Sequence, residues 1–166
     1  MKLIKLNLPL LFIFIISSFA TNFTVAQEET NKEKSEKYLK ALQELGMKDA
    51  EVKYYGGGVN FKYNNKDYYL GFIKSNKKLY YISYNTKVYV DRNNEEKEEK
   101  QYEVMSEVGK KVRYVKLYAE ENIIWIDCDF FCQSIDEFKN NLVFYLKQIE
   151  KAQLNFNDSL SKQTVK

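Results

Sequence analysis

The chain has no histidine at all and only two arginines, Arg92 and Arg113. Histidine is the usual general base of enzymes and the commonest protein ligand of zinc, so its absence removes the most frequent routes to catalysis and to a zinc site. The scarcity of arginine leaves little for bidentate recognition of phosphate groups. We therefore predict that the protein is not an enzyme and that it has no catalytic residues, no cofactor and no metal site.

Long apolar runs are also missing, except at the N-terminus. Residues 1–26 begin with Lys2 and Lys5, continue with an apolar run over 8–19, and end in small residues at Ala26. The run is too short for a bilayer core, which a helix crosses with about 20 apolar residues. We predict a signal peptide over 1–26, cleaved after Ala26, and hence a periplasmic or secreted protein. The alternative is an uncleaved N-terminal anchor.

Neither sign of charge dominates once this segment is removed. The chain has 26 basic and 23 acidic residues, and only two of the basic ones lie in residues 1–26. A nearly neutral protein is not expected to bind nucleic acid or an anionic membrane surface. We therefore predict no nucleic-acid partner and no stable membrane insertion after signal cleavage. The 140 residues that follow are enough for one domain with its own core.

The C-terminal part contains the strongest helical pattern. Ser134 is a candidate N-cap, with Glu137 three residues later in the arrangement of a capping box. Apolar residues then recur every three or four positions, which is typical of a helix that packs on a sheet. We predict a helix over 134–156 and a flexible tail over 157–166. The apolar stripe comprises Ile135, Phe138, Leu142, Tyr145, Ile149, Ala152 and Phe156.

Five segments alternate in the manner of β-strands, at 59–63, 66–74, 78–84, 112–119 and 123–130. A two-residue turn at Asn64-Asn65 places Phe61 opposite Tyr68, and the next turn places Leu70 opposite Ile82. One face of the sheet is then apolar and packs on the long helix. This core face comprises Val59, Phe61, Tyr68, Leu70, Phe72, Tyr80, Ile82 and Tyr84, with Val115, Leu117, Ile124, Ile126, Cys128 and Phe130 from the second hairpin.

Two further helices complete the predicted fold. The first spans 31–45, with a capping box at Thr30 and Glu33, and the second spans 94–108, with Asn93 as its N-cap. Residues 50–55 are a candidate short edge strand. We predict an α+β fold in the order α-βββ-α-ββ-α, with an antiparallel sheet of about five strands and the long C-terminal helix packed on one face. A single domain over 27–156 contains all of these elements.

The opposite face of the predicted sheet carries aromatic side chains. Exposed aromatic patches commonly mark an interaction surface, because tyrosine and tryptophan are enriched at protein interfaces. We therefore expect a protein partner, or a second copy of the chain, to bind there. The alternatives are that helix 31–45 or 94–108 covers this face, or that the alternation is inverted. The candidate partner-binding residues are Tyr69, Tyr81, Tyr114, Tyr118 and Trp125.

The two cysteines, Cys128 and Cys132, are either a disulfide or a pair of buried thiols. In an exported protein an even number of cysteines favours a disulfide, but four extended residues would separate the two Cα atoms too far for one. Acidic residues at 127, 129, 136 and 137 surround the same junction. The last two are explained as helix-capping acids. The alternative function is a small-ligand or metal-binding protein, or a weak hydrolase, with an acidic pocket near Asp127 and Asp129 between the long helix and the sheet.

Three segments together resemble a known family. They are VNFKYNNKDYYLGFIKSNKKLYYISY, YEVMSEVGKKVRYVKLYAEENIIWIDCDFF and SIDEFKNNLVFYLKQIEKAQLNF. In order and pattern, residues 32–156 resemble the YbjN-type domain, whose fold is that of the type III secretion chaperones. The resemblance implies a small α+β binding domain, often dimeric, without family catalytic residues. We therefore expect an exported variant of this fold that binds a protein or itself.

Overall fold

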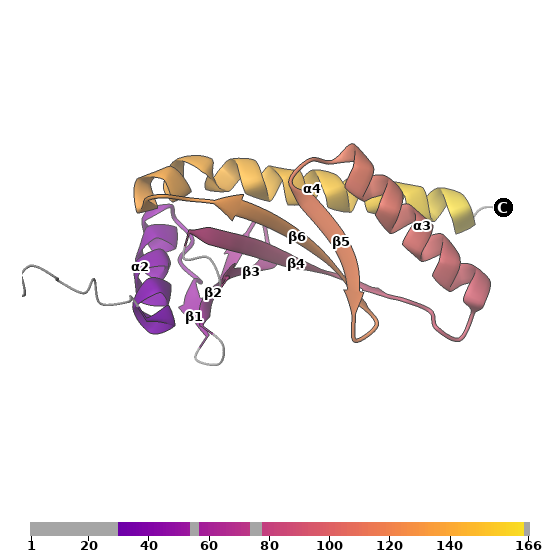
Figure 1. The fold of residues 1–166 in the computed structure, drawn as a ribbon, viewed down its shortest axis with the longest axis horizontal. Coiled ribbons are helices and arrows are strands. Elements are labelled where there is room, and N and C mark those ends of the chain that lie inside the picture. Colours follow the sequence, from indigo (N-terminus) through magenta and orange to yellow (C-terminus); the bar gives the residue numbers. More distant parts are fainter. Residues whose placement is uncertain (1–29, 54–56, 74–77, 165–166) are drawn as a thin grey trace, which may run out of the picture.

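The computed structural model describes residues 30–53, 57–73 and 78–164. They form an α+β domain in which three helices pack on a six-stranded antiparallel sheet (Figure 1). The predicted fold class is therefore confirmed, with the short edge strand as the sixth member of the sheet. The predicted signal peptide lies outside the described residues, as does most of the turn that joins the second and third strands of the predicted meander.

The helices are α2 (Asn31–Glu44), α3 (Glu95–Lys111) and α4 (Ile135–Thr164). The strands are β1 (Glu51–Val52), β2 (Gly58–Tyr63), β3 (Lys66–Phe72), β4 (Leu79–Tyr89), β5 (Val115–Glu120) and β6 (Ile123–Phe131). Their order across the sheet is β1-β2-β3-β4-β6-β5. The chain therefore leaves the sheet after β4, forms α3, and returns to place β6 beside β4.

The sequence predicted the N-terminus of α2 correctly, but it misplaced both ends of α3 and the C-terminus of α4. Thr30 and Glu33 form the capping box, with the Glu33 amide donating to Thr30 Oγ1 at 3.2 Å and the Thr30 amide to Glu33 Oε2 at 2.7 Å. The N-cap of α3 is Asn94, one residue later than predicted. The helix also continues beyond residue 108, its predicted end, through Gly109 to Lys111. Gly109 does not adopt a left-handed conformation, so it does not terminate the helix.

The long helix is longer than predicted. Ser134 Oγ accepts a hydrogen bond from the Glu137 amide at 3.1 Å, while the Glu137 carboxylate accepts from the amide of Gln133 at 2.8 Å. The tail predicted over 157–166 is helical as far as Thr164. The physical reason is that the apolar stripe does not end at Phe156, since Leu160 is partly buried against the same core.

The strand registers agree with the prediction. Phe61 lies opposite Tyr68 in β2 and β3, and Leu70 lies opposite Ile82 in β3 and β4. Asn64 and Asn65 both have positive φ values, 50° and 58°, as expected of the two-residue hairpin turn that matches the twist of paired strands. The side chains of the predicted core face are accordingly buried, except that Val115 and Leu117 of the edge strand β5 are only partly buried.

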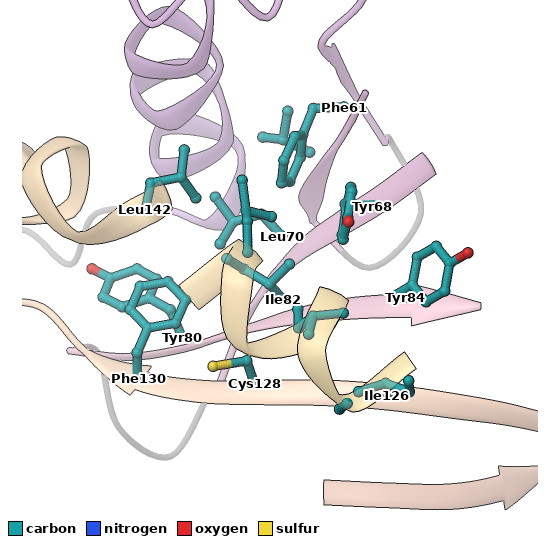
Figure 2. Close-up of a cluster of buried hydrophobic side chains, with 14 of the residues drawn as sticks. Phe61, Tyr68, Leu70, Tyr80, Ile82, Tyr84, Ile126, Cys128, Phe130 and Leu142 are labelled. Carbon is teal, nitrogen blue, oxygen red and sulfur yellow. The ribbon is translucent and has the colours of Figure 1, made fainter. Parts of the chain in front are cut away.

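The core lies between this face and α4. Figure 2 shows side chains from β2, β3, β4 and β6 gathered with Leu142 of α4. The helix buries Phe138, Leu142, Ile149, Ala152 and Phe156 of the predicted stripe, together with one residue the prediction missed, Leu146. Tyr145 and Ile135 are only partly buried at its margin.

The other two helices pack on the same side. The Tyr38 ring of α2 meets the rings of Phe72 and Tyr80 in the sheet and of Phe138 in α4, at 5.6, 5.0 and 4.8 Å between centroids. Helix α3 packs on α4 and on β5. Figure 1 shows α4 running along the sheet, with α2 near one end and α3 near the other. Neither of the shorter helices covers the face opposite α4.

None of the helices in residues 30–164 is both long and apolar enough to cross a membrane.

We expect Leu142→Ala to lower the free energy of unfolding by about 2–5 kcal/mol, because it would leave a cavity at a fully buried position between α4 and the sheet. The neighbouring Val143 is 40% exposed, so Val143→Ala is a matched control with an expected change of less than about 0.5 kcal/mol. Urea unfolding followed by circular dichroism measures both. Equal losses in the two variants would contradict the assignment of this helix face to the core.

Candidate functional site

A groove of about 700 Å³ lies on the face of the sheet opposite α4. Its lining comes from all six strands and from the segment just before β1, and none of it comes from a helix. Strand alternation and register therefore position most of the groove, although Phe61 and Tyr68 in its lining are buried residues of the core face. The lining comprises Asp49, Glu51, Lys53, Asn60, Phe61, Lys62, Asp67, Tyr68, Tyr69, Tyr81, Ser83, Asn85, Tyr118, Glu120 and Trp125.

Four of the five aromatic residues proposed from the sequence meet in this groove. Tyr69 comes from β3, Tyr81 from β4, Tyr118 from β5 and Trp125 from β6, and each is partly exposed. Tyr118 and Trp125 are directly paired across the β5–β6 hairpin. The rings of Tyr69 and Tyr81 lie 6.0 Å apart between centroids. The groove thus has aromatic side chains from four adjacent strands.

Tyr114 does not lie in the groove, and its predicted place beside the other four is wrong. Its backbone is left-handed, with a φ of 69°, and it precedes β5, which begins at Val115. Strand alternation therefore does not extend back to it. Its ring is 59% exposed and contacts Phe144 of α4 at 5.8 Å between centroids, on the helical side of the molecule.

Two glycines allow the tyrosine rings to lie close against the sheet. A Cβ atom on Gly71 would stand 2.1 Å from Cζ of Tyr81, its partner in β4. A Cβ on Gly58 would stand 2.4 Å from the hydroxyl oxygen of Tyr69, which donates a hydrogen bond to Gly57 O at 2.9 Å. Each ring occupies the space that a side chain at the glycine would need, and this fixes the ring positions in the groove.

A buried carboxylate lies at the centre of this face. Asp127 of β6 is only 5% exposed, and its two oxygens accept hydrogen bonds from Ser83 Oγ at 2.6 Å and Tyr118 OH at 3.1 Å. Burial raises the pKa of Asp127, although the two hydrogen bonds partly offset the effect. Burial, with smaller contributions from Tyr69 and Asp127, raises the pKa of Tyr81 to about 12. The phenols of the groove are therefore neutral donors near neutral pH.

The acidic pocket considered in the alternative prediction does not lie between the long helix and the sheet. Asp127 and Asp129 lie on the opposite side of β6 from Cys128, which is on the core face. Asp129 is paired with Lys116 at 3.1 Å. No cluster of three or more cysteine, aspartate or glutamate side chains with metal-binding geometry occurs in the described ranges.

Both cysteines are free thiols in the structure, and both are buried. Cys128 is fully buried on the core face, where burial raises its pKa to about 12. Cys132 follows β6 and donates a hydrogen bond from its Sγ to Ser134 O at 2.8 Å. The disulfide left open by the sequence is therefore not formed here, and neither thiol reaches the groove.

Sequence reasoning missed several residues of the groove. Strand alternation implies that Asn60, Lys62 and Ser83 lie on the outer face, but no role was predicted for them or for the segment at 49–53. The hydrogen bond between Ser83 and Asp127 joins directly paired residues of β4 and β6. The order of strands across the sheet was needed to find it. A glycine within an aromatic strand, as at Gly71, was the one local signal for a ring lying across the backbone.

Comparison with solved structures identifies this arrangement of strands and helices. The crystal structure of YbjN, "a putative transcription regulator from E. coli", superposes with a TM-score of 0.53 at 12% identity. The chain has a YbjN-like fold. The match covers 77% of this chain and 92% of YbjN. An uncharacterized protein from Methanothermobacter thermautotrophicus also matches, with a TM-score of 0.53 and 15% identity over 78% of this chain and 97% of that one.

The fold expected from the sequence resemblance is therefore confirmed. No protein-family model and no curated protein matches the chain. At 12–15% identity the YbjN-like structures establish the architecture alone, and the groove has to be interpreted from its own residues.

We expect Gly71→Ala to lower the free energy of unfolding by about 1–3 kcal/mol, because the new methyl group forces the Tyr81 ring away from the sheet. In a Tyr81→Ala background the same change should be neutral or gain up to about 1 kcal/mol, since alanine is favoured over glycine in a strand. A double-mutant cycle measured by urea unfolding separates the two effects. Additive changes would contradict the close contact between this ring and Gly71.

We expect the stability of the protein relative to Asp127→Asn to fall as the pH rises. The pKa of Asp127 is raised in the folded state, so the folded protein holds this proton more tightly than the unfolded chain. The resulting stabilisation is present below the ordinary carboxyl pKa of 3.8 and is lost as the pH rises through the folded value. Urea unfolding of both proteins between about pH 3 and pH 7 measures the difference. A difference that grows with pH would contradict this sign.

Proposed function

We propose that the protein is a non-enzymatic binding module that holds a segment of a protein partner in the groove on the outer face of its sheet. The observation that supports this most directly is the one-sided packing of α2, α3 and α4, which leaves a groove of about 700 Å³ lined by Tyr69, Tyr81, Tyr118 and Trp125. Partly exposed tyrosine and tryptophan side chains are the residues that dominate many protein interfaces.

The form of the groove favours a protein segment over a small molecule. It is open and extends over all six strands, whereas small-molecule sites usually enclose most of the ligand surface. The sheet floor gives it a fixed shape, because most of the lining residues belong to hydrogen-bonded strands. A preformed site of this kind loses little conformational entropy on binding.

Nucleic acid fits the groove poorly. Four of the lining residues are carboxylates, at 49, 51, 67 and 120, and only Lys53 and Lys62 are cationic. Phosphate groups would be repelled by this balance. The description of YbjN as "a putative transcription regulator" applies to YbjN itself. The residues of this groove give no support for DNA binding by the present chain.

The proposal includes export, because residues 1–26 have the pattern of a signal peptide. The module would then act in the periplasm or outside the cell. The partner is a different protein or a second copy of the chain, and the test distinguishes the two.

We expect Trp125→Ala to abolish or weaken partner binding at least tenfold while the fold remains intact, because the ring stands in the groove and is only partly buried. Affinity capture from the exporting organism, together with light scattering for self-association, measures binding. Tyr102→Ala is a matched control, since this aromatic residue of α3 is 41% exposed and lies outside the groove. Equal effects of the two substitutions on binding, or a monomer that captures nothing, would contradict the proposal.

A further inference from the structure

The charges of the groove differ from those of the chain as a whole. The full sequence has a net charge of +3, yet four carboxylates and two lysines line the groove. The carboxylates are spread along it, with Asp49 and Glu51 at the β1 end, Asp67 on β3, and Glu120 on β5. Asp127 adds a further acid beneath them at the centre. The groove is thus an acidic strip on a weakly basic protein.

Three of these carboxylates take no part in holding the fold together. Asp49, Asp67 and Glu120 make no side-chain hydrogen bond and no ion pair with another residue of the described ranges, whereas Glu51 accepts from Asn60 at 3.3 Å. Elsewhere on the surface, acids such as Asp129, Glu96 and Glu107 are paired with lysines. The free carboxylates of the groove are therefore available to a cationic partner.

The aromatic side chains complement such a partner. Tyrosine and tryptophan rings attract ammonium and guanidinium groups, and the aliphatic stems of lysine and arginine pack well on their faces. In the groove, carboxylates and rings lie on the same face of a strand, with Asp67 two residues before Tyr69 on β3 and Glu120 two residues after Tyr118 on β5. A long cationic side chain can then contact a ring with its stem and a carboxylate with its charged end.

The dimensions fit an extended peptide. Strands lie about 4.8 Å apart, so six strands span about 24 Å, and an extended chain of about seven residues covers that length at roughly 3.3 Å per residue. Building on the proposed function, we infer that the partner segment is an extended stretch of about seven residues that carries lysine or arginine side chains. The three unpaired carboxylates bind these cations and select basic segments over neutral or acidic ones.

Trp125 allows a direct test, because it is the only tryptophan in the chain and lies in the groove. We would titrate the purified protein with three peptides of the same length, in which threonine alternates with lysine, glutamine or glutamate. The lysine peptide should change the Trp125 emission in a saturable manner and bind more tightly than the other two. Raising the salt concentration from about 0.1 M to about 1 M should weaken this binding, because it screens exposed charges.

Charge-neutral variants identify the residues responsible. Asp67→Asn and Glu120→Gln should each weaken binding of the lysine peptide about two- to fivefold, the range expected for one exposed ion pair. Glu103→Gln is the matched control, since Glu103 is an exposed, unpaired acid of α3 outside the groove. Thermal unfolding checks that all three variants remain folded.

The outcomes separate this inference from the function it rests on. If the glutamine or glutamate peptide binds as tightly as the lysine peptide, or if Glu103→Gln has the same effect as Asp67→Asn and Glu120→Gln, the inferred preference for basic segments is overturned while binding in the groove stands. If no peptide alters the emission, the inference is overturned, and capture of a partner through Trp125 decides the proposed function separately.

Discussion

Burial of one face of the sheet against α4 is the interaction on which the rest of the structure depends. Leu70, Ile82 and Ile126 are completely buried on that face, and Leu142 and Ile149 are completely buried on the helix. A thirty-residue amphipathic helix gains most of its stability from tertiary packing, and an isolated sheet face of this apolar character would associate with other surfaces. Each layer therefore requires the other. The helix side of the molecule is fixed by this requirement.

Packing of the inner face on α4 also determines the outer face of the sheet. Because side chains alternate along a strand, fixing the inward residues also fixes which residues face outward. Those positions carry tyrosines and a tryptophan, whose rings cover backbone at Gly58 and Gly71 while their polar atoms stay accessible to hydrogen bonding. The buried Asp127 is less easily explained by stability, since desolvation raises its pKa and disfavours the charged form. Hydrogen bonds from Ser83 and Tyr118 to its two oxygens offset part of this cost.

The sequence predicted those features that depend on local periodicity. The core face, the registers around Asn64-Asn65 and the choice of outer residues all followed from alternation within single hairpins. Helix ends were harder, because Asn93 and Asn94 are equally good caps and Gly109 is compatible with a helix as well as with its end. The predicted helix was too short at the C-terminus of α4 because one isolated apolar residue, Leu160, does not indicate a helix in the sequence. Its contact with the core is visible only in the structure.

The site was predicted less completely than the fold, because its geometry depends on contacts between strands that are distant in the chain. Nothing local places Ser83 beside Asp127, 44 residues away, and strand alternation could not anticipate the left-handed backbone at Tyr114. The difference between fold and site also limits the comparison with the YbjN-like structures, which concerns the fold. A fold shared at 12–15% identity is maintained by the apolar inner positions, which tolerate exchange among residues of similar size. The outward positions are not needed for that packing, so they are free to differ between proteins with this fold. The acidic and aromatic character of the groove is therefore a property of this chain, and its binding preference has to be derived from these side chains.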